Sequence, residues 1–119
     1  MYPGIDIIEI SRFAQACSRQ PRLLARLFTA QELELAKNNI PSLAARFAGK
    51  EAVLKALGTG LSGLSWHDIE ILTNDRGEPF VCLSERVEEI MKNRKGTEVR
   101  VSLSHSRDNA IAMAILIQE

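Results

Sequence analysis

The segment from Ser42 to Leu57 is rich in alanine and leucine and contains no proline, so it predicts a long helix against which the rest of the chain packs. Gly58-Thr59-Gly60 follows, and Gly58 suits the left-handed position that ends a helix. Gly49 lies inside this segment, where glycine costs about 1 kcal/mol relative to alanine. We therefore expect a neighbouring element or a ligand to approach the backbone closely at Gly49.

The remaining segments alternate between helical and extended patterns. Thr29 and Glu32 have the spacing of a capping box and predict a helix that runs to about Lys37, before Asn38, Asn39 and Pro41 interrupt it. We expect an α+β fold in one domain, residues 1–119, with a mostly antiparallel sheet packed against the long central helix. The other expected helices are Ser11–Gln20, Arg22–Phe28 after Pro21, and Ser84–Lys95, and the expected strands are Ile5–Ile10, Asp68–Thr73, Pro79–Leu83, Glu98–His105 and Asn109–Ile117.

The charge balance argues against some classes of partner. Fifteen basic and 15 acidic residues give a formal net charge of zero, which favours neither a nucleic-acid-binding nor a membrane-surface protein. Cys17 and Cys82 are far apart and form no metal or redox motif, so we expect a reduced, cytoplasmic protein. Residues 1–4 lack the features of a signal peptide, and the longest apolar run, Ala110 to Ile117, is too short to span a bilayer.

One stretch is locally basic. Arg12, Arg19, Arg22 and Arg26 lie between Glu9 and Glu32 with no acidic residue among them. Such a patch favours an acidic protein partner through electrostatic steering. A solvated helix face would have the same composition, so both interpretations remain open at this point.

Two carboxylates stand out by their context. Asp6 lies in an otherwise apolar strand, and Glu51 lies midway along the central helix. A magnesium ion takes one or two carboxylates and leaves its other positions for water and phosphate oxygens, so this pair would suffice. The alternatives are a strand-end cap for Asp6 and a surface ion pair between Glu51 and Lys55.

The central helix carries further charges on neighbouring ridges. At roughly 100° per residue, Arg46 and Lys50 share one ridge, while Glu51 and Lys55 share another. These charges around an apolar strip would suit a pyrophosphate with its metal ion, although a solvent-exposed helix with paired charges has the same pattern. The turn from Gly58 to Gly60 would offer backbone N–H groups to a phosphate, or would simply end the helix.

The chain resembles the holo-acyl-carrier-protein synthase family of phosphopantetheinyl transferases. The matching segments occur in the family's order and cover nearly the whole chain. They are Gly4-Ile5-Asp6-Ile7, Arg46-Phe47-Ala48-Gly49-Lys50-Glu51-Ala52, Lys55-Ala56-Leu57-Gly58-Thr59-Gly60, Trp66-His67-Asp68-Ile69-Glu70-Ile71, Gly77-Glu78-Pro79 and Ser102-Leu103-Ser104-His105. The resemblance implies the 4′-phosphopantetheinyl transferase fold.

The resemblance also implies a reaction. The 4′-phosphopantetheine arm of coenzyme A moves to a serine hydroxyl of an apo acyl carrier protein, and adenosine 3′,5′-bisphosphate is released. Asp6 and Glu51 are then expected to bind Mg²⁺, which also holds the pyrophosphate of the coenzyme. Lys55 is expected to stabilise the developing charge, and Glu51, directly or through a bound water, to take the serine proton.

The same resemblance assigns binding roles to residues elsewhere. Arg46, Lys50, Gly58 and Gly60 are expected to contact the coenzyme. His105, at the end of a strand, is expected to help bind the 3′-phosphate region from a neighbouring subunit.

The resemblance also implies how the chain assembles and which partner it binds. A homotrimer with active sites at its subunit interfaces would enclose a cleft that a chain of 119 residues cannot easily enclose alone. The final apolar strand would help to line the trimer core. Arg12 matches a position that faces the acidic carrier, and Arg19, Arg22 and Arg26 would extend that surface.

The chain departs from the family pattern at two positions. Tyr2 stands where glycine is usual, and Gly49 stands where alanine is more frequent. Two other functions would use the same residues. A magnesium-dependent phosphohydrolase of nucleotide diphosphates would use water in place of serine, and a trimeric carrier-binding module would keep the fold without catalysis.

Overall fold

The order of helices and strands is the one expected. A computed structural model describes residues 1–119. The strands are β1 (Tyr2–Glu9), β2 (Ile69–Thr73), β3 (Pro79–Leu83), β4 (Gly96–His105) and β5 (Asn109–Gln118). The helices are α1 (Ile10–Arg19), α2 (Leu23–Leu27), α3 (Ala30–Ala36), α4 (Ile40–Leu57) and α5 (Glu85–Asn93), with a short 3₁₀ helix at Trp66–Asp68.

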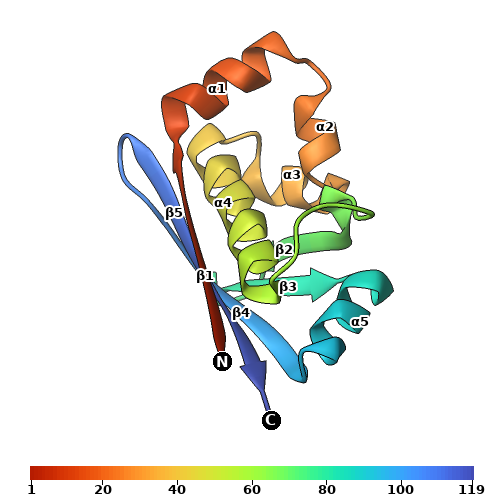
Figure 1. Cartoon of the computed structure of the whole chain (residues 1–119). Helices are drawn as coiled ribbons and strands as arrows, with labels where there is room; N and C mark the ends of the chain where they lie inside the picture. The colour runs from red at the N-terminus through yellow and green to blue at the C-terminus, as the bar shows by residue number, and fades with distance from the viewer.

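The strands form two antiparallel sheets. β5 lies between β1 and β4 in a three-stranded sheet, and β2 pairs with β3 in a separate hairpin. Figure 1 shows α4 lying along the three-stranded sheet, with α1, α2 and α3 gathered toward one end and α5 toward the other. The expected α+β fold with an antiparallel sheet against a central helix is confirmed.

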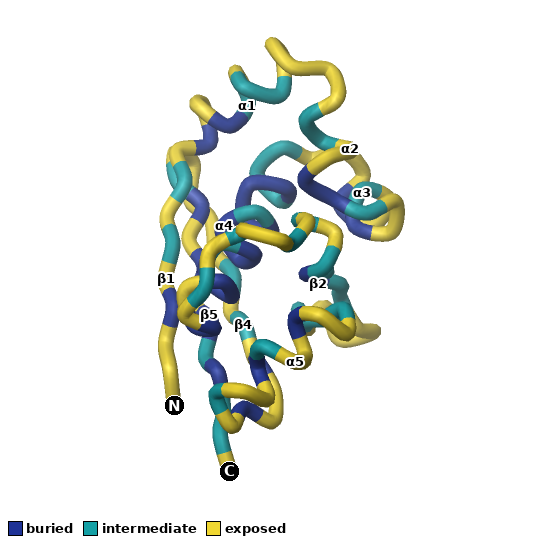
Figure 2. The backbone as a smooth tube through the Cα atoms, turned by 45° about the vertical axis from the view of Figure 1, so that its right-hand side comes forward, coloured by how far each residue is buried: buried dark blue, intermediate teal, exposed yellow.

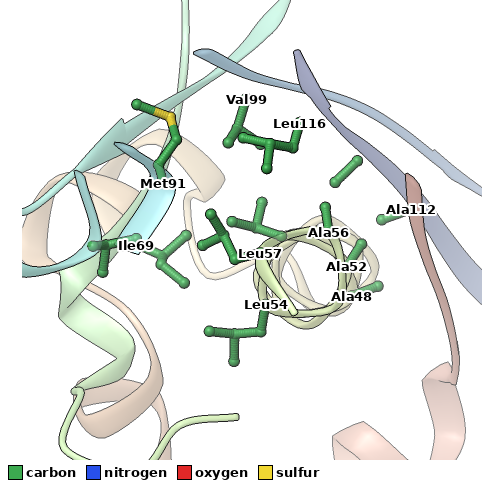
Figure 3. Packing of buried hydrophobic residues seen from close by; sticks show 13 residues of the cluster. Ala48, Ala52, Leu54, Ala56, Leu57, Ile69, Met91, Val99, Ala112 and Leu116 are labelled. Atoms are coloured by element: carbon green, nitrogen blue, oxygen red, sulfur yellow. The ribbon is translucent and has the colours of Figure 1, made fainter. Parts of the chain in front are cut away.

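Small side chains let α4 approach the sheet closely. Ala48, Ala52 and Ala56 lie on the side of the helix that faces Ala112 of β5, and all four are buried (Figure 3). Gly4 of β1 also packs against α4, where a Cβ atom would overlap the carbonyl oxygen of Ala52. Since no side chain separates the two backbones here, β1 lies directly against α4.

Gly49 has the packing reason that its position requires. A Cβ atom there would lie 2.5 Å from Cδ1 of Ile71 and 3.0 Å from Cδ2 of Leu103. The side chains of β2 and β4 thus occupy the space that an alanine would need, which confirms the expected close approach.

Most helix ends follow the predicted capping chemistry. Thr29 caps α3, and Glu32 reaches back to the Thr29 N–H at 2.9 Å, as a capping box requires. Gly58 ends α4 in the left-handed conformation, with φ of 71°.

Two predicted helix starts were wrong. Helix α4 begins at Ile40, because Asn39 caps it and Pro41, in the first turn, loses no needed hydrogen bond. Pro21 was expected in the first turn of the second helix, but it lies in a turn that precedes α2, which begins at Leu23.

Helix α4 is the centre of the molecule. Buried residues concentrate along it in Figure 2, because the three-stranded sheet, β2 and the helices α1 and α3 pack around it. One apolar cluster joins α4 to β2, α5, β4 and β5, and a second joins the beginning of α4 to α1, α2 and α3. None of the helices combines the length and the apolar character needed to cross a membrane.

Candidate active site

Asp6 and Lys55 meet where β1 passes α4. The ammonium of Lys55 donates to Oδ1 of Asp6 at 3.1 Å and to the backbone carbonyl of Ile5 at 2.9 Å. The Asp6 side chain is 17% exposed and that of Lys55 is 54% exposed. Asp6 lies in the middle of β1, opposite Ala112 of β5, so it is not a strand-end cap.

Glu51 lies one helical turn before Lys55, and the negative charge of Asp6 acts on it. Burial raises the pKa of Glu51 above its usual range, the negative charge of Asp6 raises it further, and Lys55 lowers it. The two carboxylates are therefore close enough to repel one another. The ion pair of Lys55 is with Asp6, not with Glu51 as in the surface-pair alternative.

This donor set fits a magnesium ion. Two carboxylates that repel one another gain from a cation between them, and the ammonium of Lys55 already occupies oxygens of Ile5 and Asp6. No group of three His, Cys, Asp or Glu side chains is placed to hold a metal. Magnesium is usually bound by one or two carboxylates, and water and phosphate oxygens complete its coordination. A site with only two carboxylates leaves those positions open.

Lys50 was expected to share a ridge with Arg46 and to contact the coenzyme, but it lies in the interior. The side chain is fully buried, and its ammonium donates to the carbonyl oxygens of Leu27 and Trp66 and to Oε1 of Glu32. Burial lowers the pKa of Lys50, while Glu32 counteracts this effect. All three ammonium donors are used within the chain, so the expected contact between Lys50 and the coenzyme is not available in this arrangement.

Arg46 also points inward. Its guanidinium donates to the carbonyl oxygen of Ile71 at 3.3 Å, to Oγ of Ser42 at 2.6 Å and to Oγ1 of Thr73 at 2.9 Å. It therefore ties α4 to β2, and it is only 8% exposed. A coenzyme could contact Arg46 only through the 8% of its surface that remains exposed.

Glu32 is the residue whose role the sequence did not reveal. Besides closing the capping box, it is completely buried, pairs with Lys50 at 2.7 Å and accepts from the Ile71 N–H at 2.8 Å. The capping-box spacing was the only available signal. It identifies the local bond to Thr29 but not the distant partners.

Gly58 and His105 lie at opposite ends of the sheet. The end of α4 at Gly58 lies beyond Gly4 of β1, which packs against Ala52 and Ala56. His105, by contrast, is exposed at the end of β4 and pairs with Ala110, which in turn pairs with Ile8 of β1. One chain therefore does not bring His105 to the turn that contains Gly58 and Gly60.

The two glycines of this turn, Gly58 and Gly60, have different surroundings. The guanidinium of Arg94 fills the space beside Gly58 and donates to the Ala56 carbonyl at 3.0 Å, whereas no atom lies within 4 Å of the Cβ position of Gly60. The ring of Tyr2 also lies against this guanidinium, and the ring centroid is 3.6 Å from its central carbon. Tyr2 thus has a defined packing role in place of the glycine usual at its position.

The basic stretch is fully accessible. Arg12, Arg19, Arg22 and Arg26 are exposed on and between α1 and α2, which project at the upper end of Figure 1. Arg12 lies 3.7 Å from Glu9 in a solvent-exposed pair that contributes little stability. The surface is therefore available to a partner.

Comparison with known proteins decides the family. The sequence profile of the 4′-phosphopantetheinyl transferase superfamily matches residues 2–115. The chain belongs to this superfamily.

Individual members of the superfamily are similar over almost their full length. A holo-[acyl-carrier-protein] synthase of Moorella thermoacetica is 50% identical over 116 residues, which cover 95% of this chain and 91% of that protein. One from Alkaliphilus metalliredigens is 47% identical over 115 residues, 94% of each. The crystal structure of Helicobacter pylori holo-[acyl-carrier-protein] synthase in complex with coenzyme A has a TM-score of 0.87 and 33% identity, and the match covers 97% of this chain and 99% of that one.

Proposed function

We propose that this chain transfers the 4′-phosphopantetheine arm of coenzyme A to a serine of an apo acyl carrier protein. The observation that supports this most is the meeting of Asp6, Glu51 and Lys55 beside α4, in a superfamily member whose relatives are holo-[acyl-carrier-protein] synthases. The structure of the Helicobacter pylori relative contains coenzyme A, which supports coenzyme A as the donor here.

Lys55 and Glu51 have separate roles in this reaction. The serine oxygen forms a bond to the β-phosphorus of the coenzyme, and the bond from that phosphorus to the oxygen of the 5′-phosphate breaks. Lys55 stabilises the negative charge on the departing phosphate, and the carboxylate of Glu51 accepts the serine proton. The products are holo carrier protein and adenosine 3′,5′-bisphosphate.

Asp6 and Glu51 would hold magnesium. When bound, the ion supplies neutralisation of charge on the pyrophosphate oxygens. Asp6 is well placed for this role because Gly4, two residues earlier, fixes β1 against α4. The raised pKa of Glu51 also suits a group that must take up a proton.

The outer face of the three-stranded sheet supports a homotrimer. Ile5, Ile7, Ile111 and Met113 are 39–63% exposed, and the strand register sets Ile5 opposite Met113 and Ile7 opposite Ile111. A contiguous exposed apolar patch of this kind marks a protein interface. An active site between subunits would also explain why His105 and Gly58 lie far apart in one chain, since His105 would serve the site of a neighbour.

The carrier is expected to dock on α1 and α2. The arginines at positions 12, 19, 22 and 26 are exposed and would attract an acidic carrier protein. We place the enzyme in the cytoplasm, and fatty acid biosynthesis is the expected pathway because it depends on such carriers.

The test is incubation of the protein with coenzyme A, Mg²⁺ and a panel of apo acyl carrier proteins, followed by intact-mass measurement. Addition of the phosphopantetheine arm to a carrier is the expected result. Breakdown of coenzyme A without a carrier would indicate a phosphohydrolase instead. Formation of a complex with neither reaction would indicate a carrier-binding module.

A further inference from the structure

The ammonium of Lys55 lies beside two carboxylates, Asp6 and Glu51, whose mutual repulsion a cation reduces. The ammonium contacts two oxygens, Oδ1 of Asp6 and the carbonyl of Ile5, on the strand that also supplies the proposed metal ligand. Glu51 lies one turn away on the same helix and repels Asp6. The two acidic side chains and Lys55 together therefore carry a net charge of about −1, with the one positive group bound to Asp6.

We propose that Lys55 is a built-in substitute for the divalent cation, and that it must leave Asp6 before the ion binds there. This inference depends on the proposed function, since it takes Asp6 and Glu51 as the ligands of magnesium. The ammonium then moves to the phosphates of the coenzyme. Binding of the ion and binding of the coenzyme are thereby coupled through one side chain.

Electrostatics favours this exchange. An ammonium beside Asp6 repels a divalent cation at the same carboxylate and occupies one of its two oxygens. The diphosphate of the coenzyme provides a new acceptor for Lys55, and the divalent ion replaces the ammonium as the partner of Asp6.

The side chain is able to make this movement. Lys55 is 54% exposed, and its hydrogen bonds are only those to Ile5 and Asp6. Partly exposed ion pairs are weak, so release from Asp6 is easy once another anion is present. Lys50, on the same helix, is by contrast fully buried with all its donors engaged.

The test measures metal binding without turnover. Isothermal titration would give the affinity for Mn²⁺, alone and with coenzyme A as the nucleotide, corrected for Mn²⁺ bound by the free nucleotide. The variants are Lys55→Met and, as a control for loss of one positive charge, Lys92→Met on α5, where the lysine is exposed. Circular dichroism would verify that both variants fold.

Removal of Lys55 should tighten Mn²⁺ binding in the absence of nucleotide by about three- to tenfold. In the wild type the nucleotide should raise Mn²⁺ affinity, and Mn²⁺ should raise nucleotide affinity by the same factor. This factor should shrink in Lys55→Met and remain unchanged in Lys92→Met.

Two results would overturn the inference while leaving the proposed function intact. In one, Lys55→Met binds Mn²⁺ alone no more tightly than the wild type. In the other, it keeps the full coupling between ion and nucleotide. If the wild type binds Mn²⁺ neither alone nor with the nucleotide, the metal role of Asp6 and Glu51 fails, and the inference fails with it.

Discussion

Glu51 is held in a position that disfavours its charge, because burial and the neighbouring Asp6 both raise its pKa above the ordinary value of 4.5. Between pH 4.5 and the raised pKa, the folded state binds more protons than the unfolded state. The contribution of Glu51 to stability therefore falls as pH rises through this window, and the penalty is complete above it. The proposed roles of Glu51, as a metal ligand and proton acceptor, require the charge that folding disfavours.

Glu51→Gln is accordingly predicted to stabilise the metal-free protein at pH 7, by less than about 1 kcal/mol because the site is partly solvated. The gain should disappear below pH 4.5, where the glutamate is protonated in both states. Urea unfolding with a chelator present, at pH 4 and pH 7, measures the difference. A variant that is less stable than the wild type at pH 7 would contradict this account.

Gly4 fixes the approach of β1 to α4, and its replacement should disturb both stability and the site. A Cβ atom there would overlap the Ala52 carbonyl, which is backbone and cannot move aside. Gly4→Ala should lose about 1–3 kcal/mol. Gly60→Ala is the matched control, because nothing lies near its Cβ position, and it should change stability by less than about 0.5 kcal/mol. Equal midpoints for the two variants in urea would exclude the proposed close packing.

At the scale of elements, the buried Glu32–Lys50 pair connects α3, α4 and β2. The two side chains are fully buried and 2.7 Å apart, and their other hydrogen bonds reach Leu27, Trp66 and Ile71. A buried charge left without its partner is far more costly than the loss of both charges. The pair should therefore behave as a unit in a double-mutant cycle.

Lys50→Met should lose about 3–5 kcal/mol of unfolding free energy, because it leaves the Glu32 carboxylate uncompensated. The double variant Glu32→Gln/Lys50→Met should recover a large part of that loss. Arg12→Gln, which breaks the exposed pair with Glu9, should cost at most about 1 kcal/mol. Urea unfolding measures these three variants and Glu32→Gln alone. Losses in the double variant equal to the sum of the two single losses would show that the two charges act independently.

The elements also show which features can be predicted from sequence. Capping residues, turns and alternation are local, so the strands and most helix ends were predictable from Thr29, Gly58 and the apolar patterns. The orientation of α4 was not, because a helix covered on several sides lacks an amphipathic stripe that would indicate its surface. Arg46 and Lys50 were expected on one ridge that contacts the coenzyme, yet acceptors from distant parts of the chain hold them inside.

The candidate site was predictable in part. The resemblance identified Asp6, Glu51 and Lys55, and the structure brings these three together through Gly4. The contact between Lys55 and Asp6, unlike the alternative ion pair between Lys55 and Glu51, depends on how β1 crosses the helix. Sequence spacing within α4 contains no information about that crossing.

At the scale of the whole molecule, the separation of His105 from Gly58 predicts complementation between subunits. Glu51→Gln and His105→Ala should each be poorly active, but trimers assembled from an equal mixture should regain about a quarter of wild-type turnover, since that share of interfaces combines two intact residues. The control mixes Glu51→Gln with Lys55→Met. Both residues come from the same α4, so no activity should return.

These mixtures would be prepared by unfolding and refolding the variants together, and light scattering would report the number of subunits. A monomeric wild-type protein, or restored activity in the control mixture, would rule out active sites built from two subunits. If both single variants are inactive, absence of restoration in the first mixture would place His105 and Glu51 in the site of the same subunit.

A crystal structure with Mn²⁺ and adenosine 3′,5′-bisphosphate tests the central claim most directly, because anomalous scattering locates the ion independently of the protein coordinates. The account predicts an anomalous peak in contact with carboxylate oxygens of both Asp6 and Glu51 and with phosphate of the nucleotide. A peak bound to other residues, or to the nucleotide alone, would contradict it.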